Sequence, residues 1–272
     1  MFFDVLLQGQ LLWNLPLLLV FLFMGGLYVV LLHSFTKLKI RQKQPLLFFL
    51  SLAILYLTIG SPLSSLSHLS ISLHMLQLSI LYFIIPPLFL LGIPESLIQQ
   101  FGKTSLSKKI GKFVIPPKAA LYAFGALFLM YHFPAILTFL SQSTMFHNVY
   151  LFILLVLSFW MWRPLAVPDL KKSGSVGKNK NYVVLSGLVL MPACLLFVFN
   201  AIIGEMNNPF LIQMTANLCM SPSDFNILPS PFNTSFDQIL AGILMLAMHK
   251  LGLTLTVRLR YIVQRRTVVD KY

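Results

Sequence analysis

Apolar segments long enough to cross a membrane recur along the whole chain and restrict the folds open to it. The run LLWNLPLLLVFLFMGGLYVVLL near the N-terminus is apolar on every face of a helix. A bilayer core about 30 Å thick is crossed by roughly 20 such residues in a helix. We predict seven transmembrane helices that form one domain over residues 1–272, with spans at residues 12–32, 46–60, 71–91, 118–140, 147–165, 183–204 and 237–257.

The composition favours an all-α membrane protein over the alternatives. With 57% hydrophobic and 10% charged residues, the chain is far more apolar than a soluble domain. The strands of a membrane β-barrel alternate apolar and polar residues over about ten positions, and these segments do not. The second span, 46–60, is short and could extend toward Leu66. The first span lacks the basic start and the cleavage motif of a signal peptide, so we expect it to be retained.

All but one of the 20 Lys and Arg residues fall into four clusters, which occupy every second gap between the apolar segments. Loops beside membrane spans carry Lys and Arg on the cytoplasmic side. We therefore predict an outer N-terminus and a cytoplasmic C-terminus. The net charge of +13 reflects this orientation, so no nucleic-acid partner is expected. Only Lys250 lies outside the clusters, which are Lys37, Lys39, Arg41 and Lys43; Lys103, Lys108, Lys109, Lys112 and Lys118; Arg163, Lys171, Lys172, Lys178 and Lys180; and Arg258, Arg260, Arg265, Arg266 and Lys271.

The predicted inner face carries charge and no recognisable chemistry. Residues 95–117 mix apolar side chains with lysines, which is typical of an amphipathic helix on a lipid surface. Residues 171–181 have the composition of a solvated loop. Neither stretch has the glycine spacing of a phosphate-binding loop. We predict anionic lipid as the partner at this face.

Histidines and methionines gather at the predicted outer face. His74, His132 and His147 each lie near the outer end of a predicted span, and at 1.5 Å per residue their depths agree within a few ångströms. Met75 follows the first of them directly. Imidazole and thioether ligands suit copper, Cu(I) above all. We predict a copper site from these residues, with Cys219 and Met220 of the loop at residues 205–236 as further soft ligands.

Other polar residues in or near the spans leave alternatives open. Each histidine could simply extend its ring to the lipid headgroups. Asp237 is either the N-cap of the seventh helix or, like Gln77, a group that orients a metal-binding side chain. His249 lies in the inner half of the last span and either faces the bundle or the lipid boundary. No nucleophile elbow, HExxH or Cys-x-x-Cys occurs, so we predict that the protein is not an enzyme.

Residues 61–94 contain the most specific motif of the chain. SPLSSLSHLSISLHMLQLSILYFIIPPLFLLGIP resembles the CtaG family of cytochrome c oxidase assembly factors. The blocks YHFPAILTFL, FWMWRPL and DQILAGILM extend the resemblance over residues 45–257. Many members of the family have a second histidine after the glutamine of the His-Met-x-Gln motif, where this chain has Leu78. The matching elements are Ser61-Pro62-Leu63, His74-Met75-Leu76-Gln77, Pro86-Pro87 and Leu91-Gly92-Ile93-Pro94.

The resemblance implies a protein of the bacterial plasma membrane that is needed to make an active haem–copper oxidase. Oxidase subunits are then its expected partners, a homo-oligomer is a further option, and copper delivery is the role usually proposed for the family. Two alternatives stay open at this point. One is a transporter for a small solute or a metal ion, and the other is a scaffold for oxidase subunits that binds no metal.

Overall fold

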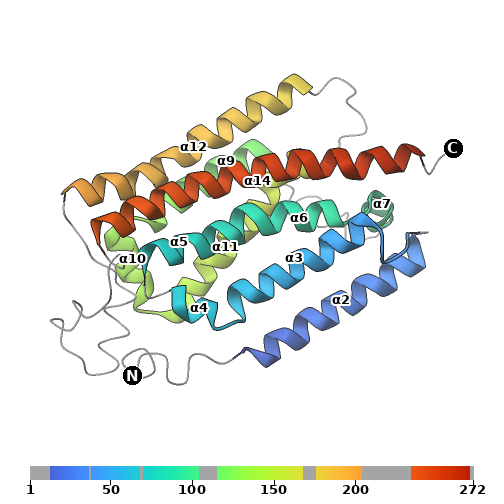
Figure 1. Cartoon of the computed structure of the whole chain (residues 1–272), viewed down its shortest axis with the longest axis horizontal. Helices are drawn as coiled ribbons and strands as arrows, with labels where there is room; N and C mark the ends of the chain where they lie inside the picture. The colour runs from blue at the N-terminus through green and yellow to red at the C-terminus, as the bar shows by residue number, and fades with distance from the viewer. Residues whose placement is uncertain are drawn as a thin grey trace.

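A computed structural model describes residues 13–36, 38–67, 70–103, 115–167, 176–203 and 234–269 of the chain. Within these ranges every regular element is a helix and there is no strand, which confirms the predicted all-α class. The long helices form an elongated bundle with α2 at one edge and α12 at the opposite edge (Figure 1). In chain order the elements are α2 (Leu15–Phe35), α3 (Lys43–Ile59), α4 (Leu63–Leu66), α5 (Ile71–Ser79), the π-helix η2 (Ile80–Ile84), α6 (Ile85–Gly92), α7 (Glu95–Lys103), α9 (Pro117–Tyr131), α10 (Pro134–Ser141), α11 (Thr144–Ala166), α12 (Val176–Ile203) and α14 (Ser235–Val269).

Five helical segments of the described chain are long and apolar enough to cross a membrane. These five correspond to five of the seven predicted spans, and the spans predicted at 46–60 and 118–140 are not among them. The segment predicted at 46–60 is shorter than the five. It corresponds to α3, an apolar helix of 17 residues that starts at Lys43. The five segments are Leu15–Phe35, Ile71–Gly92, Thr144–Ala166, Lys180–Ile203 and Ser235–Val263.

The predicted span at 118–140 is broken in the structure. Helix α9 ends at Tyr131, and α10 starts at Pro134 after a turn at His132 and Phe133. The ring of a proline disfavours helical backbone at the residue before it, and Phe133 accordingly has φ −70° and ψ 129°. The expectation of one continuous helix was therefore wrong, and the break lies directly beside His132.

Two consecutive prolines shape the middle of the third predicted span. Pro86 and Pro87 have no N–H groups, so the carbonyls of Tyr82 and Phe83 lose the donors that an α-helix would supply four residues on. The wide π-turn η2 occupies this stretch. Trp162 of α11 donates its indole N–H to the Tyr82 carbonyl at 2.8 Å. The freed carbonyl is thereby paired inside an apolar bundle, where an unpaired one is costly.

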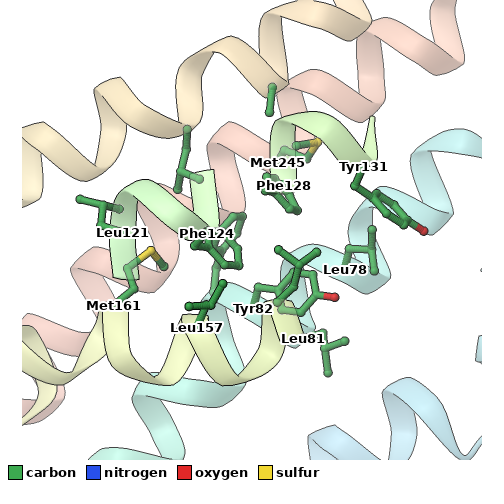
Figure 2. Close-up of a cluster of buried hydrophobic side chains, with 14 of the residues drawn as sticks. Leu78, Leu81, Tyr82, Leu121, Phe124, Phe128, Tyr131, Leu157, Met161 and Met245 are labelled. Carbon is green, nitrogen blue, oxygen red and sulfur yellow. The ribbon is translucent and has the colours of Figure 1, made fainter. Parts of the chain in front are cut away.

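Aromatic side chains fill the centre of the bundle (Figure 2). Tyr82 and Phe83 of η2 pack edge-on against Phe124 and Phe128 of α9, with ring centroids 5.6–6.2 Å apart. All four side chains are buried, as is Leu78. This packed apolar centre offers no support for the transporter alternative, which needs a polar path across the bilayer.

Close backbone contact joins α6 to the α2–α3 edge of the bundle. A Cβ atom on Gly92 would lie 2.6 Å from the backbone nitrogen of Phe48, so only glycine fits this crossing. Tyr28 of α2 donates its hydroxyl to the Gly92 carbonyl at 2.8 Å, and its ring stacks on Phe48 with centroids 3.8 Å apart. The first two helices are thus fixed to the third predicted span at its C-terminal end.

Several sequence predictions fall wholly or partly outside the described residues. Of the amphipathic helix predicted at 95–117, the structure describes α7, Glu95–Lys103, whose Leu97 is buried against α2 and α3. The continuation at 104–114 is not among the described residues, and neither are the loop residues 168–175. Cys219 and Met220 also lie outside them, within 204–233.

Candidate functional site

Asp237, at the start of α14, holds the start of α5. Its side chain is 1% exposed; Oδ1 accepts the Ser70 hydroxyl at 2.8 Å and Oδ2 accepts the Ile71 N–H at 3.0 Å. Ser72 donates both its hydroxyl and its N–H to Oδ1. Oxygens that accept the first N–H groups of a helix act as its cap, here supplied by a different helix. The N-terminal turn of α14 itself uses Thr234, whose Oγ1 accepts the Asp237 N–H at 3.3 Å.

Helix α5 places His74 inside the bundle. Its ring is hydrogen-bonded to a hydroxyl that is also hydrogen-bonded to a second histidine. His74 Nε2 lies 2.8 Å from the Tyr131 hydroxyl, and the same hydroxyl lies 2.9 Å from His147 Nε2. Tyr131 sits at the edge of the aromatic core with its hydroxyl pointing away from it (Figure 2). Two of the three predicted histidine ligands therefore converge on one point, which the Tyr131 oxygen occupies.

The shared hydroxyl constrains the protons on both imidazoles. A phenol has one hydrogen, so Tyr131 can donate to only one of the two nitrogens. For both hydrogen bonds to form, at least one of His74 and His147 must carry its hydrogen on Nε2. The protonation patterns of the two rings are therefore coupled through Tyr131.

His132 and Met75 form a second pair. It lies beside the group of His74, Tyr131 and His147, because Met75 follows His74 and His132 follows Tyr131 in the sequence. His132 Nε2 lies 3.1 Å from the Met75 sulfur, and its Nδ1 faces the Phe128 carbonyl. A carbonyl only accepts, so Nδ1 must carry a hydrogen, and the neutral ring then has a lone pair on Nε2. Two soft donor atoms, an imidazole nitrogen and a thioether sulfur, therefore face one another in the buried interior.

Gln77 holds α5 on its other side. Its amide donates to the Thr58 carbonyl at 2.8 Å, and its oxygen accepts the Ser67 hydroxyl at 2.7 Å. These bonds tie α5 to the C-terminal end of α3. Like Asp237, Gln77 fixes the helix that carries His74 and Met75.

The three predicted histidines and Met75 are thus brought together, and the donor set is imidazole and thioether. In the part of the chain that the structure describes, no three His, Cys, Asp or Glu side chains are grouped as a metal cage would need. A single ion would instead find two neighbouring positions. One lies between His132 and Met75, and the other lies where the Tyr131 hydroxyl joins His74 and His147.

The sequence reasoning missed three residues at this site. Tyr131 precedes His132 directly, and a tyrosine within an apolar span needs a partner for its hydroxyl, which was the available signal. Ser70 and Ser72 flank the start of α5, but their partner Asp237 is 167 and 165 residues away. No local pattern relates positions that far apart.

The fold and the site define a helical membrane protein with an imidazole–thioether cluster at one end of its buried core. A family model described as cytochrome c oxidase caa3 assembly factor (Caa3_CtaG) matches residues 26–260, a range that includes all the described residues of the cluster. The chain belongs to this family, which confirms the resemblance seen in residues 61–94. No curated protein and no solved structure is significantly similar to it.

Proposed function

We propose that the protein holds copper at the outer face of the bacterial plasma membrane and hands it to a cytochrome c oxidase during assembly. Membership of the caa3 assembly-factor family supports the assembly role. The observation that carries the copper part is the buried pair of His132 Nε2 and Met75 Sδ, which face one another at 3.1 Å. Imidazole and thioether together are a soft ligand set that favours Cu(I).

The second position, between His74 and His147, adds two candidate copper ligands. His74 Nε2 and His147 Nε2 lie within 2.9 Å of one hydroxyl, so a small displacement of Tyr131 would leave two nitrogens aimed at one ion. Met75 is adjacent to His74 in the sequence, and His132 is adjacent to Tyr131. The same two backbone segments therefore carry ligands of both positions. An ion could therefore pass between them without any helix leaving the bundle.

The proposed orientation puts this site on the outside. We propose seven crossings with the N-terminus outside and the C-terminus in the cytoplasm, since the starts of α5, α11 and α14 all follow gaps that contain no Lys or Arg. The starts of α5 and α11 and the end of α9 supply the cluster, and the start of α14 supplies Asp237. Copper would then reach it without crossing the apolar core.

Copper binding by purified protein tests the proposal. Met75→Leu keeps the volume of the side chain and removes the sulfur, and His132→Gln removes the ring. We expect the double variant to bind less Cu(I) than the unaltered protein in competition with a coloured Cu(I) chelator. Met191→Leu is the matched control, because Met191 is exposed on α12. Equal copper binding by the double variant and the control would reject this site.

A metal-free scaffold is the second candidate, and one observation favours it. The described residues contain no group of three His, Cys, Asp or Glu side chains that could hold a metal ion, and Tyr131 already joins two of the histidines. On this alternative, oxidase subunits would co-purify with the protein and oxidase activity would persist after His74, His132 and His147 are replaced. Loss of oxidase activity with retained co-purification would favour copper handling.

Anionic lipid is the partner that we propose at the inner end of α2. A pocket there combines basic side chains with an apolar wall. Such a pocket suits a phospholipid whose headgroup is negatively charged. Replacement of Lys39 and Arg41 by Gln should lower the amount of phosphatidylglycerol that co-purifies, measured by mass spectrometry of the lipid extract, while equal retention would contradict the assignment. The pocket is lined by Val29, Leu32, His33, Thr36, Leu38, Lys39, Ile40 and Arg41.

A further inference from the structure

A second buried imidazole lies deeper in the bundle. His249 follows Asp237 by 12 residues on α14, which places it about 18 Å further along the helix. The sequence left open whether it faces the bundle or the lipid. It is 5% exposed, and its ring packs on Phe83 and Trp162 with centroids 5.2 and 6.1 Å apart. His249 therefore faces the bundle, whereas its neighbour Lys250 is exposed.

One nitrogen of the His249 ring has an unused hydrogen-bonding capacity among the described residues. Among the described residues, His249 Nε2 is buried and has no hydrogen-bond partner, and the same is true of the Ser79 hydroxyl oxygen. Leaving a buried polar group unpaired costs about 1–3 kcal/mol. A group that is kept at such a cost calls for an explanation beyond packing.

Met245 places a thioether on the same face of α14. It precedes His249 by four residues, which is the spacing of side chains that lie one above the other on a helix. It is buried and belongs to the same core cluster as Phe128, where both are labelled in Figure 2. A buried imidazole and a buried thioether therefore share one face of α14.

The register between α14 and the π-helix brings Ser79 to the same level. Ser72 meets Asp237 and Phe83 meets His249, so the two helices run in the same direction with an offset of 165 or 166 residues. Ser79 then falls opposite Met245. The contact is close, since a Cβ atom on Gly252 would lie 2.4 Å from the Phe83 carbonyl oxygen. The wide turn that the two prolines impose thus lies against this face of α14, and such turns recur at functional sites.

We infer that His249 and Met245 form a second Cu(I)-binding position inside the bundle, with His249 Nε2 and the Met245 sulfur as its ligands. The inference deepens the proposed function and rests on it for the identity of the metal. The donor chemistry is that of the His132–Met75 pair, and the unpaired nitrogen is the observation that points to a ligand.

The two positions share no residue and are separated by aromatic rings. His132 packs on Phe128 at 4.5 Å, Phe128 on Phe83 at 5.9 Å, and Phe83 on His249 at 5.2 Å between centroids. The imidazoles of His132 and His249 therefore lie at the two ends of one row of rings. Each position can be removed without touching a ligand of the other.

Copper stoichiometry of the full-length protein tests the inference. The deep variant combines His249→Leu with Met245→Leu, which keep apolar packing while removing both ligands. The outer variant combines Met75→Leu with His132→Gln, and Lys250→Gln serves as the control. Each is titrated with Cu(I) against a coloured chelator, and unfolding in rising dodecyl sulfate checks that it folds.

We expect the deep variant and the outer variant each to bind one copper fewer per chain than the control. X-ray absorption of copper held by the outer variant should still report a sulfur ligand, and that signal should disappear when Met245→Leu is added. A deep variant that binds as much copper as the control overturns the inference. If instead the outer variant loses nothing while the deep variant loses one copper, the outer site fails and the deep position stands.

If the deep variant fails to fold, the single replacement Met245→Leu decides the matter. Leucine preserves the volume, so the fold should persist. Weaker copper binding by the outer variant once Met245→Leu is added supports the inference. An unchanged affinity overturns it.

Discussion

Asp237 offers the sharpest test of how the site is held, because its side chain accepts hydrogen bonds from the first backbone N–H groups of another helix, α5. Asp237→Ala removes the acceptor of four hydrogen bonds, two from hydroxyls and two from backbone N–H groups. The hydroxyls of Ser70 and Ser72 are 3.0 Å apart and can pair with each other. The N–H groups of Ile71 and Ser72 have no such substitute.

The expected cost follows from those two N–H groups. A buried donor left without a partner costs about 1–3 kcal/mol, so we expect Asp237→Ala to lower the free energy of unfolding by about 3 kcal/mol. Asp237→Asn retains one acceptor oxygen and should cost about half as much. Because α5 carries His74 and Met75, the Ala variant should also bind Cu(I) more weakly.

Reversible unfolding in mixed micelles, driven by dodecyl sulfate and followed by circular dichroism, measures these free energies. The Ser72→Ala variant completes a double-mutant cycle with Asp237→Ala, in which we expect a coupling of about 1 kcal/mol. Strictly additive losses, or a loss below about 1 kcal/mol for Asp237→Ala, would refute the assignment of this carboxyl group as the cap of α5.

Three further changes test the packing that supports the site, all measured by the same unfolding titration. Gly252→Ala should cost about 1–3 kcal/mol because its Cβ would meet the Phe83 carbonyl, whereas Gly26→Ala, which meets nothing within 4 Å, should be neutral or stabilising; equal effects would contradict this. Trp162→Phe should cost about 1–3 kcal/mol because a buried carbonyl loses its donor, and a neutral result would mean that another group pairs with it. Tyr131→Phe should cost about 1–2 kcal/mol while copper binding persists, and loss of copper with the fold intact would make the hydroxyl itself a ligand.

The sequence predicted the helices well because their cause is local. Twenty apolar residues in a row can only be helix within a bilayer, so the segments and the all-α class follow from composition along the chain. The break beside His132 has an equally local signal in Pro134, which the continuous prediction of 118–140 overlooked. The π-turn was harder, since Pro86 and Pro87 predict a disturbance but not its form.

The candidate site was predictable only in part. A helical rise of 1.5 Å per residue was enough to expect His74, His132 and His147 in one layer. The helical rise could not predict that the Tyr131 hydroxyl lies between two of these histidines, because the rotation of a helix about its axis depends on tertiary packing. The role of Asp237 was out of reach for the same reason, since its partners are on a helix more than 160 residues away.

The double proline also has a consequence for how the chain is made. A span that enters lipid alone must satisfy its own backbone, and Pro86 prevents the segment Ile71–Gly92 from doing so at the Tyr82 carbonyl. The missing donor is the indole of Trp162, which is synthesised about 80 residues later. We therefore expect this segment to remain beside the insertion machinery until α11 emerges, so that the two enter the bilayer as a pair.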